Sequence, residues 1–352
     1  MEAIIPAVDP VLLKAELTPD KKLQDTNKGG NELYIVTAHD APNVMLEIGR
    51  LREEAFRAAG GSSGKSADID EYDTMDNPYR QLVVWDPSAS AILGGYRFML
   101  GNEVDFDSNG VPRLATAHMF RFSDKFISEY LPHTMELGRS FVSVGYQSSK
   151  AGAKAIFSMD NLWDGIAAVM MQHSRMLYFF GKMTIYQSYN PAARDLLFHF
   201  LFKHFPDRDN LVTPIEPVLP DSNAELMDLI LNDEGFKSDY RNLKDAMRRL
   251  GTNIPPLVNS YINSSPTMKM FGTAVNHEFG EVFESAILVC FKEMYDEKVG
   301  RHIEAYTKGI MDKILQRFPK IGDRDQQRLA RRFQERKENV FVRFNSKKDN
   351  PR

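Results

Sequence analysis

The sequence predicts an α/β domain in which helices flank a mixed sheet, followed by a helical C-terminal extension. Three observations carry this prediction. Short β-type runs alternate with helical patterns over 31–220, in the order strand, helix, hairpin, strand, helix, strand, helix, which is typical of layered α/β folds. Hydrophobic residues make up 43% of the 352 positions, enough to bury such a core. Beyond 221 the pattern turns mainly helical.

The N-terminal part is expected to run from an arm into a strand and a helix. Residues 1–30 are polar and lack a clear period, so we interpret them as a flexible arm. The β-rich run 33–38 predicts the first strand. A helix begins near Pro42, because apolar residues then recur at helical spacing. Glycines within 60–64 end this helix and open a flexible acidic loop that reaches Tyr79.

The next part supplies a hairpin and a further strand. Two β-type runs, 81–86 and 91–98, are joined by only four residues, which predicts an antiparallel hairpin. A short helix is expected around 123–130. The run 134–144 then reads as another strand.

A long helix and a buried strand follow. Apolar residues over 161–180 predict a helix, with Gly181 placed as its C-terminal cap. Residues 182–186 read as a buried strand. Asn190 directly precedes a proline, and this pair is a strong start signal for a helix over 192–205.

The chain divides into a core over 31–220, a C-terminal subdomain over 221–316 that completes the core, and a basic tail over 317–352. The tail holds 12 Lys/Arg against 5 Asp/Glu, whereas the net charge of the whole chain is −4. An acidic body with a basic tail argues against general nucleic-acid binding and for one local electrostatic contact. Candidate partners of the tail are an acidic carrier protein and the anionic inner leaflet of a membrane, and a solvated helix is the third reading.

Several classes of protein are not expected from the composition. No apolar run is long enough to cross a bilayer and no secretory signal is visible, so we expect a cytoplasmic protein. A single cysteine, Cys290, excludes an internal disulfide and lies in an apolar run, where a thiol is usually inert. The histidines show no paired metal-ligand spacing, so no metal is expected.

Two motif matches are read as accidents. The glycine-rich stretch 59–66 fits a relaxed phosphate loop, but a helix precedes it and the acidic stretch 68–71 follows, which would repel an anion. His204 and Asp209 have the spacing of glycerolipid acyltransferases, but Pro206 lies between them, so we interpret this stretch as a helix end.

The most informative segment surrounds Gly138, which is flanked by Glu136 and Arg139 within a β-like run. One reading is an ordinary ion pair between neighbouring strands. On a regular strand, residues three apart point to opposite faces. A bulge at Gly138 would turn both charges to one side and spread the sheet.

The run Glu-Leu-Gly-Arg-Ser-Phe-Val that begins at Glu136 resembles the signature of a GNAT-fold branch, which contains ornithine-lipid N-acyltransferases and acyl-homoserine-lactone synthases. Further pieces match in the same order. They are Arg52 with Phe56, the acidic loop from Asp70 to Asp73, the hairpin with Trp85 and Arg97, and the stretches 162–166 and 254–258. The last two favour the ornithine-lipid and glycine-lipid side of the branch, also called hemolysin-like. The resemblance covers roughly residues 33–290.

This resemblance implies a GNAT-like fold and an acyltransferase that works without a covalent enzyme intermediate. The expected reaction moves a long, 3-hydroxylated acyl chain to the α-amine of a small amino acid, glycine or ornithine, as the first step of aminolipid synthesis. No cofactor is bound permanently, and the donor is acyl carrier protein or acyl-CoA. Residues 147–153 place their glycine two positions later than the CoA pyrophosphate motif does, which favours the carrier protein.

The resemblance also assigns roles to residues. Glu136 is the candidate base for the amine, Arg139 holds its geometry, and Tyr189 either protonates the leaving thiolate or packs at a strand end. Backbone groups freed between splayed strands would bind the donor's pantetheine arm. The candidate donor-binding residues are Phe141, Val142 and Val144, within the stretch from Phe141 to Tyr146, and Asn190 at the start of the later helix.

The acceptor's carboxylate needs a cationic partner, and Arg52 and Arg97 are the candidates for it. Phe56 belongs to the same acceptor site, and Asp70 and Asp73 shape or close the loop above it. Two other functions stay open from the sequence alone. One is an acetyl-CoA-dependent N-acetyltransferase on the same fold, and the other is a non-catalytic protein that binds lipid or acyl carrier protein.

Overall fold

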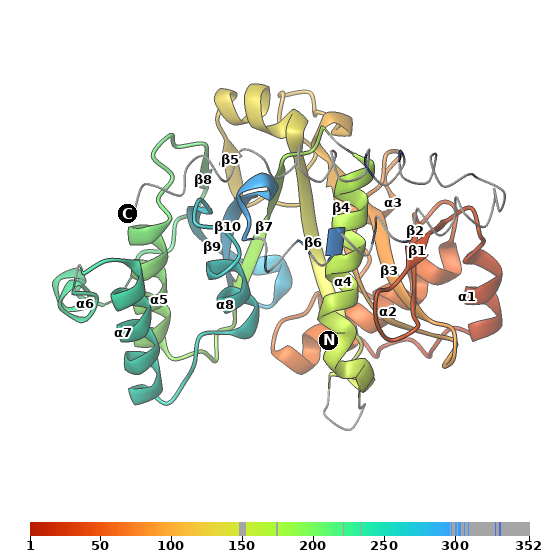
Figure 1. The fold of residues 1–352 in the computed structure, drawn as a ribbon, viewed down its shortest axis with the longest axis horizontal. Helices are drawn as coiled ribbons and strands as arrows, with labels where there is room; N and C mark the ends of the chain where they lie inside the picture. Colours follow the sequence, from red (N-terminus) through yellow and green to blue (C-terminus); the bar gives the residue numbers. More distant parts are fainter. Residues whose placement is uncertain are drawn as a thin grey trace.

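The computed structural model describes residues 1–147, 153–173, 175–220, 222–232 and 234–295, and then 297, 300, 302, 303, 306, 309, 328 and 331. An eight-stranded sheet forms the centre, in the order β1-β2-β3-β4-β6-β7-β10-β9. Helix α4 crosses in front of this sheet, and α5, α7 and α8 lie together beside it (Figure 1). The mixed sheet flanked by helices confirms the predicted fold class. The basic tail over 317–352 lies outside the described residues except for 328 and 331.

The N-terminal strands form an antiparallel meander, namely β1 (Lys22–Asp25), β2 (Glu32–Val36), β3 (Arg80–Asp86) and β4 (Ala91–Leu100). The expected hairpin is therefore confirmed. The expectation of a loose arm over 1–30 is wrong, because this segment contains α1 (Pro10–Glu16) as well as β1. The Glu16 carboxylate accepts hydrogen bonds from the backbone N–H groups of Asn43 and Val44. Such contacts between distant segments leave no local period in the sequence.

The first long helix, α2 (Pro42–Ala59), ends at Gly60 in the left-handed conformation (φ 98°), as expected. The loop behind it is ordered rather than flexible. It contains α3 (Glu71–Thr74), which begins at a capping box formed by Asp70 and Asp73. Ion pairs described below hold this loop against the sheet.

Around the sheet's centre, β6 (Thr134–Val142) leads into α4 (Ala153–Gln172) and then β7 (Tyr178–Ile185). The helix expected over 161–180 is wrong at its C-terminal end, where Tyr178 already begins the strand. Gly181 lies within β7 rather than capping a helix, and a Cβ there would be 2.8 Å from the Leu137 carbonyl oxygen. Apolar runs satisfy helix and strand patterns alike, so periodicity could not locate this boundary.

The C-terminal part begins with α5 (Pro191–His204), whose expected start at Asn190 is confirmed. It continues with α6 (Ala224–Ile230), α7 (Phe236–Arg249), α8 (Pro256–Ile262), β9 (Lys269–Asn276) and β10 (Val282–Cys290). The antiparallel pairing of β10 with β7 adds two strands to the main sheet. A separate two-stranded sheet joins β5 (Phe120–Phe122) to β8 (Val212–Pro214).

Single turns of helix occupy Gly101–Glu103, Phe126–Tyr130, Leu131–His133, Val144–Tyr146, His277–Phe279 and Phe291–Glu293. The turn at Phe126–Tyr130 falls within the short helix expected over 123–130. Within the described ranges, no helix combines the length and the apolar character of a membrane span.

The feature that positions the site is a fork between two parallel strands. The ladder between β6 and β7 joins only Thr134–Glu136 to Tyr178–Phe180, although both strands continue for several residues. Splayed neighbouring strands of this kind leave backbone N–H and C=O groups without ladder partners. The fork was expected from the family resemblance.

Candidate active site

A bulge lies in β6 beside the fork. Arg97 of β4 faces Gly138, whereas Gly95 faces Phe141, so Arg139 and Ser140 together stand opposite one residue of β4. Arg139 has a positive φ of 49°, while Gly138 does not. The expected bulge is therefore present one residue later than predicted. Glu136 and Arg139 both line the same cavity, as the sequence analysis expected.

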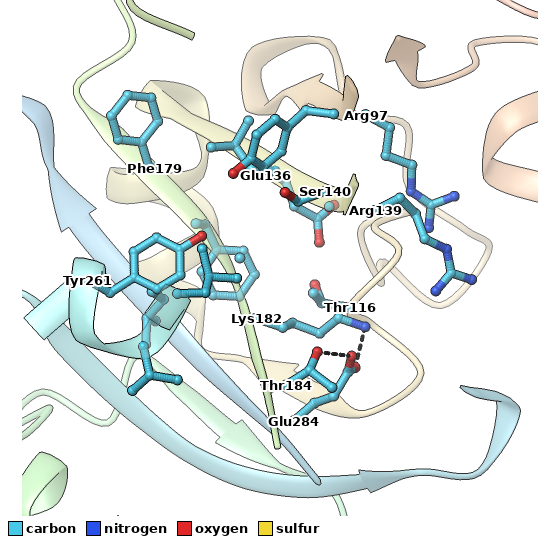
Figure 2. A pocket seen from close by; sticks show the side chains of 18 of the residues that line it. Arg97, Thr116, Glu136, Arg139, Ser140, Phe179, Lys182, Thr184, Tyr261 and Glu284 are labelled. Carbon is cyan, nitrogen blue, oxygen red and sulfur yellow. Dashed lines mark hydrogen bonds and ion pairs between the residues drawn. The ribbon is translucent and has the colours of Figure 1, made fainter. Parts of the chain in front are cut away.

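This cavity has a volume of about 530 Å³ and lies at the fork. One part of its wall is polar and the other is apolar (Figure 2). The polar part includes Thr116, Glu136, Arg139, Lys182, Thr184 and Glu284. The apolar part includes Trp163, Ile166, Phe179, Val258, Ile287 and Met294.

The two parts of the wall belong to opposite faces of the sheet. Phe179 and Phe180 are successive residues of β7, so their side chains point to opposite faces. Phe179 packs in the core beneath α4, and Phe180 packs in a second core with Tyr79. Both phenylalanines line the cavity. The cavity therefore reaches both faces through the gap between the forked strands.

Glu136 lies in the polar wall and is 3% exposed. Its Oε2 accepts a hydrogen bond from the Tyr79 hydroxyl, which in turn accepts one from the Ala115 N–H at 2.8 Å. Within the described part of the chain, Oε1 has no hydrogen-bond partner. Burial raises the pKa of Glu136 above its usual range, although the Tyr79 hydrogen bond, the neighbouring Thr116 hydroxyl and the charge of Arg97 oppose this shift. A carboxylate of raised pKa with one unoccupied oxygen is suited to accept a proton.

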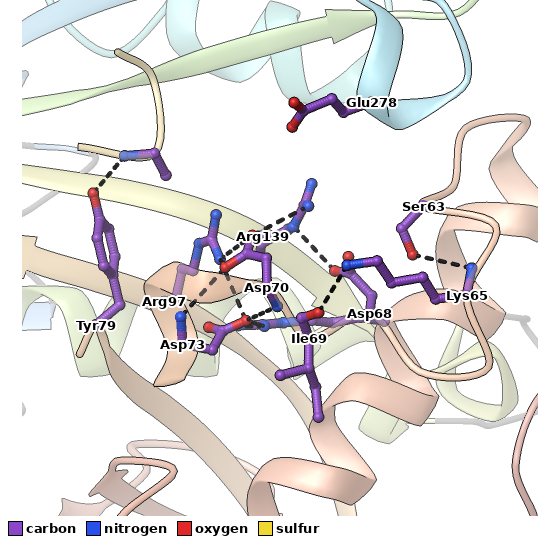
Figure 3. Close-up of polar contacts among 12 residues, drawn as sticks. Ser63, Lys65, Asp68, Ile69, Asp70, Asp73, Tyr79, Arg97, Arg139 and Glu278 are labelled. Carbon is purple, nitrogen blue, oxygen red and sulfur yellow. Dashed lines mark hydrogen bonds and ion pairs between the residues drawn. The ribbon is translucent and has the colours of Figure 1, made fainter. Parts of the chain in front are cut away.

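Three arginines and three aspartates form a chain of ion pairs that holds the acidic loop to the sheet. Figure 3 shows Arg97 and Arg139 among Asp68, Asp70 and Asp73. The ion pairs are Arg52–Asp73 at 3.2 Å, Arg97–Asp73 at 3.3 Å, Arg97–Asp70 at 2.7 Å, Arg139–Asp70 at 3.5 Å and Arg139–Asp68 at 3.0 Å. Burial alone would raise the pKa of Asp70, but Arg97 and Arg139 outweigh it and hold that pKa well below its usual range. The Asp70 carboxylate therefore stays ionised at neutral pH.

This network corrects two expected roles. Arg52 is fully buried, does not line the cavity, and donates hydrogen bonds to Asp73 and Gln81, so it cannot contact a substrate. It lies on the face of α2 that packs on the sheet. Arg139 does not hold Glu136, because the bulge turns its guanidinium toward Asp68 and Asp70 and over the Phe279 ring, 4.5 Å from the ring centre.

The other acceptor-site candidates are divided between the cavity and its support. Arg97 and Phe56 line the cavity. Asp70 and Asp73 do not line it, and instead bind the Arg97 guanidinium from the loop. The structure thus places two of the five candidates in the cavity wall, whereas Arg52, Asp70 and Asp73 lie behind it.

Two candidates at the end of β7 are wrong as cavity residues. The Tyr189 hydroxyl donates to the Asn253 carbonyl at 2.6 Å. The Asn190 side chain caps α5 by accepting from Ala193 N–H, and it also donates to the Leu250 carbonyl. Neither side chain lines the cavity. The segment after α7 covers both residues, which nothing in the local sequence indicates.

The donor-binding candidates on β6 and in the turn after it, Phe141, Val142 and Val144, do not line the cavity with their side chains. Phe141 packs in the core under α2, Val142 is half-buried, and Val144 is exposed. From this stretch the structure brings Ser140 and Gln147 into the wall instead. The expectation for these candidates concerned their backbone groups, which border the fork.

Several polar residues of the cavity were not expected from the sequence, and Tyr79, Thr116, Lys182 and Glu284 are among them. Tyr79 and Thr116 come from loops, and no local pattern marks them. Lys182 on β7 pairs with Glu284 on β10, with Nζ and Oε2 2.5 Å apart. A signal for Lys182 did exist, because lysine and Thr184 alternate with apolar residues in a strand that was expected to be buried.

The glycine-rich stretch, the His204 motif and Cys290, which the sequence analysis set aside, are not placed for catalysis. The glycine loop after α2 is occupied by the chain's own carboxylate, since Glu53 accepts from the N–H groups of Ser63 and Gly64 at 3.3 and 3.2 Å. His204 pairs with Asp239 rather than with Asp209. Burial raises the pKa of Cys290 to about 11, which leaves the thiol protonated. Among the described residues, no group of His, Cys, Asp and Glu side chains could hold a metal ion.

Comparison with known proteins gives a consistent picture. Residues 51–155 match the model of the acetyltransferase (GNAT) domain family. A glycine N(alpha)-acyltransferase of Phocaeicola vulgatus is 55% identical over 308 residues, which cover 88% of this chain and 94% of the relative. A glycine N(alpha)-acyltransferase of Bacteroides thetaiotaomicron is 55% identical over 314 residues, 89% of this chain and 93% of the relative. No solved structure matches the chain significantly.

Proposed function

Because this chain belongs to the GNAT-fold N-acyltransferase family that includes these two glycine N(alpha)-acyltransferases, we propose that it transfers a long acyl chain from acyl carrier protein to the amine of glycine. The observation that carries the proposal is one cavity that reaches both faces of the sheet, with a proton-accepting carboxylate on one face and an apolar wall on the other. As the family resemblance implies, the acyl chain is 3-hydroxylated and the product is an aminolipid precursor.

The amine must lose a proton before it attacks the thioester, because the α-ammonium of a free amino acid has a pKa above neutrality. Glu136 takes this proton on Oε1, directly or through one water. Its raised pKa supports the role, since a carboxylate closer to neutrality is a stronger base. Tyr79 fixes the other oxygen and thereby orients the carboxylate.

The donor's pantetheine arm enters the fork between β6 and β7 and pairs with their backbone groups as an added strand would. A backbone N–H in the fork then stabilises the negative charge that develops on the thioester oxygen. The amine nitrogen forms a bond to the thioester carbon as the carbon–sulfur bond breaks and the thiolate leaves. The apolar wall around Phe179 and Ile166 receives the acyl chain.

A basic face of α7 supports a carrier protein as the donor. Lys237, Arg241 and Arg248 are exposed at intervals of four and seven residues, which places them along one side of the helix. Asp245 lies on the same side and pairs with Arg248 at 3.0 Å, so three cations face one carboxylate there and the net charge of this face is positive. The chain then runs from the end of α7 to Pro255, which lines the cavity. Acyl carrier proteins are acidic, so this face complements them electrostatically.

The test is reconstitution with purified enzyme. Long-chain acyl-carrier-protein with and without a 3-hydroxyl, the matching acyl-CoA and acetyl-CoA are each offered with a panel of amino acids, and products are identified by mass spectrometry. We expect N-acylglycine from acyl-carrier-protein. Turnover with acetyl-CoA alone would overturn the proposal in favour of the N-acetyltransferase. Membership of an enzyme family argues against the non-catalytic alternative.

A further inference from the structure

The structure leaves the acceptor's carboxylate without the partners that the sequence suggested. Arg52 is sealed away from the cavity. Arg97 is held by both oxygens of Asp70 at 2.7 Å and by Asp73 at 3.3 Å. Arg139 is shared between two carboxylates and an aromatic ring. Each of these guanidinium groups thus binds loop carboxylates, and those of Arg97 and Arg139 bind two each, although Arg97 Nε has no hydrogen-bond partner among the described residues.

Lys182 is the cation of the cavity wall with the fewest commitments. Among the described residues, Glu284 is the acidic group with which it forms an ion pair. An ammonium group has three donors, and its side chain is 16% exposed. Figure 2 shows Lys182 extending across the polar end of the cavity toward Thr116, below Arg139. An anion in the cavity can therefore reach this ammonium.

Glu284 is built to hold that lysine in place. Its carboxylate is 3% exposed and also accepts hydrogen bonds from Thr184 Oγ1 at 3.2 Å and Asn276 Nδ2 at 3.0 Å. Burial alone would raise the pKa of Glu284, but Lys182 and Asn276 outweigh it and lower that pKa. A buried ion pair is costly to desolvate, and this one lies in a cavity wall rather than in closed core, which points to a ligand.

The distance from Glu136 suits a small amino acid. Phe180 stands opposite Glu136 in the ladder, and Lys182 follows two residues later on the same face of β7. The backbone positions of Phe180 and Lys182 are therefore about 7 Å apart along β7, and Glu136 lies one strand across from Phe180. An α-amino acid that forms a hydrogen bond of about 3 Å at each end has the length to reach from one of these two side chains to the other. The carboxylate then meets Lys182 while the amine faces Glu136.

We propose that Lys182, positioned by Glu284, binds the α-carboxylate of the acceptor amino acid and thereby directs its amine toward Glu136. This inference rests on the proposed function and names the acceptor subsite within it. It accounts for a requirement that the base alone does not impose, namely that the acceptor be an amino acid rather than any primary amine.

The test compares glycine with glycinamide, which keeps the amine but lacks the carboxylate. In K182M we expect the KM for glycine to rise about 10-fold to 100-fold, as for loss of a charge-assisted hydrogen bond, with little change for glycinamide. K182R should recover part of the loss. K269M is the matched control, because Lys269 lies in the same sheet, pairs with Asp207 and Asp209, and does not line the cavity.

Glu284 acts through Lys182, so E284Q should raise the KM for glycine more than it lowers kcat. Equal effects of K182M on glycine and glycinamide, or none on either, would overturn the inference. Should K182M fail to fold, K182Q keeps a donor for Glu284 and takes its place.

Direct binding separates this inference from the proposed function. Glycine and glycinamide are titrated into wild-type and K182M protein by saturation-transfer NMR without any donor. If the wild-type protein transfers no acyl chain to glycine yet binds glycine in a Lys182-dependent way, the proposed function fails and the subsite stands. If wild-type and K182M proteins bind glycine equally, the subsite fails.

Discussion

Glu136 and Phe180 stand opposite each other in the last pair of the short ladder between β6 and β7. The candidate base is thus fixed at the point where the two strands separate. Its carboxylate cannot drift from the fork, because the backbone on both sides is still paired there. An amine that reaches Glu136 on one face is therefore next to the gap in which we propose that the thioester binds.

Replacement of the base tests its role most directly. In E136Q the side chain keeps its shape but cannot take a proton, so we expect kcat to fall at least about 100-fold. Binding of the acyl donor should be unchanged, because the donor lies in the fork and the apolar wall. Steady-state kinetics and a donor-binding titration check both expectations. Retained activity in E136Q would exclude Glu136 as the base.

The same variant should be more stable than the wild type at alkaline pH. Burial raises the pKa of Glu136, so the folded state binds this proton more tightly than the unfolded state does. From about pH 4.3, the pKa of an exposed glutamate, up to the raised pKa, the group's contribution to stability is lost as pH rises. Melting temperatures from pH 4 to 9 should show an advantage for E136Q that grows with pH and vanishes near pH 4. A difference that is constant with pH would contradict this linkage.

Arg52 should matter for stability rather than for substrate affinity. R52M leaves Asp73 buried with one cation fewer, and breaking a buried pair typically costs about 3–5 kcal/mol. We expect a loss of that order in the free energy of unfolding, measured by urea denaturation. R248A, which breaks an exposed pair with Asp245, should cost less than about 1 kcal/mol. A stable R52M protein with a raised KM for glycine would restore Arg52 to the acceptor site.

Gly181 should be needed to keep the fork in shape. A Cβ at this position would lie 2.8 Å from the Leu137 carbonyl oxygen, which belongs to backbone and cannot step aside cheaply. We expect G181A to lose about 1–3 kcal/mol of unfolding free energy. Gly145 has nothing within 4 Å of such a Cβ, so G145A is the control and should change stability little. Equal unfolding free energies of G181A and G145A would mean that β6 and β7 can separate at this position at little energetic cost.

Changes to the basic face of α7 should weaken the use of acyl carrier protein as donor and leave smaller donors unaffected. In R241E/R248E we expect the KM for acyl-carrier-protein to rise at least about tenfold at low salt, with less effect at high salt because the contact is screened. The KM for acyl-pantetheine should stay the same. R241E alone and K14E each reverse one charge, and K14E, on exposed α1 far along the chain, serves as the control for that single variant. An equal rise in KM for acyl-carrier-protein and for acyl-pantetheine would contradict a contact between α7 and the carrier protein.

Much of the fold follows from local patterns. Helix α2 has both an apolar stripe and a glycine cap, and α5 has an asparagine and a proline at its start. The boundary between α4 and β7 could not be found this way, because Tyr178 to Phe180 suit either structure. Helix α1 was missed although it starts as α5 does, with a capping side chain at Asp9 followed by Pro10. Its seven residues are too few to show a helical period, and its apolar side packs on α2.

The site was predictable only in part. The signature around Gly138 located the bulge to within one residue and brought Glu136 to the cavity. It could not show that Arg139 turns away to the loop, since that depends on the positive φ of a single residue. Lys182 and Glu284 lie 102 positions apart, and the pairing of β10 with β7 alone brings them together.

The fork has a consequence for how turnover ends. A product made there has its polar head on one side of the sheet and its hydrocarbon tail on the other, joined through the gap. For the product to leave, one of its two ends has to pass between β6 and β7. The rate of product release then depends on how far β6 and β7 can separate. It also depends on Gly181, where the backbone of β7 lies close to the Leu137 carbonyl of β6.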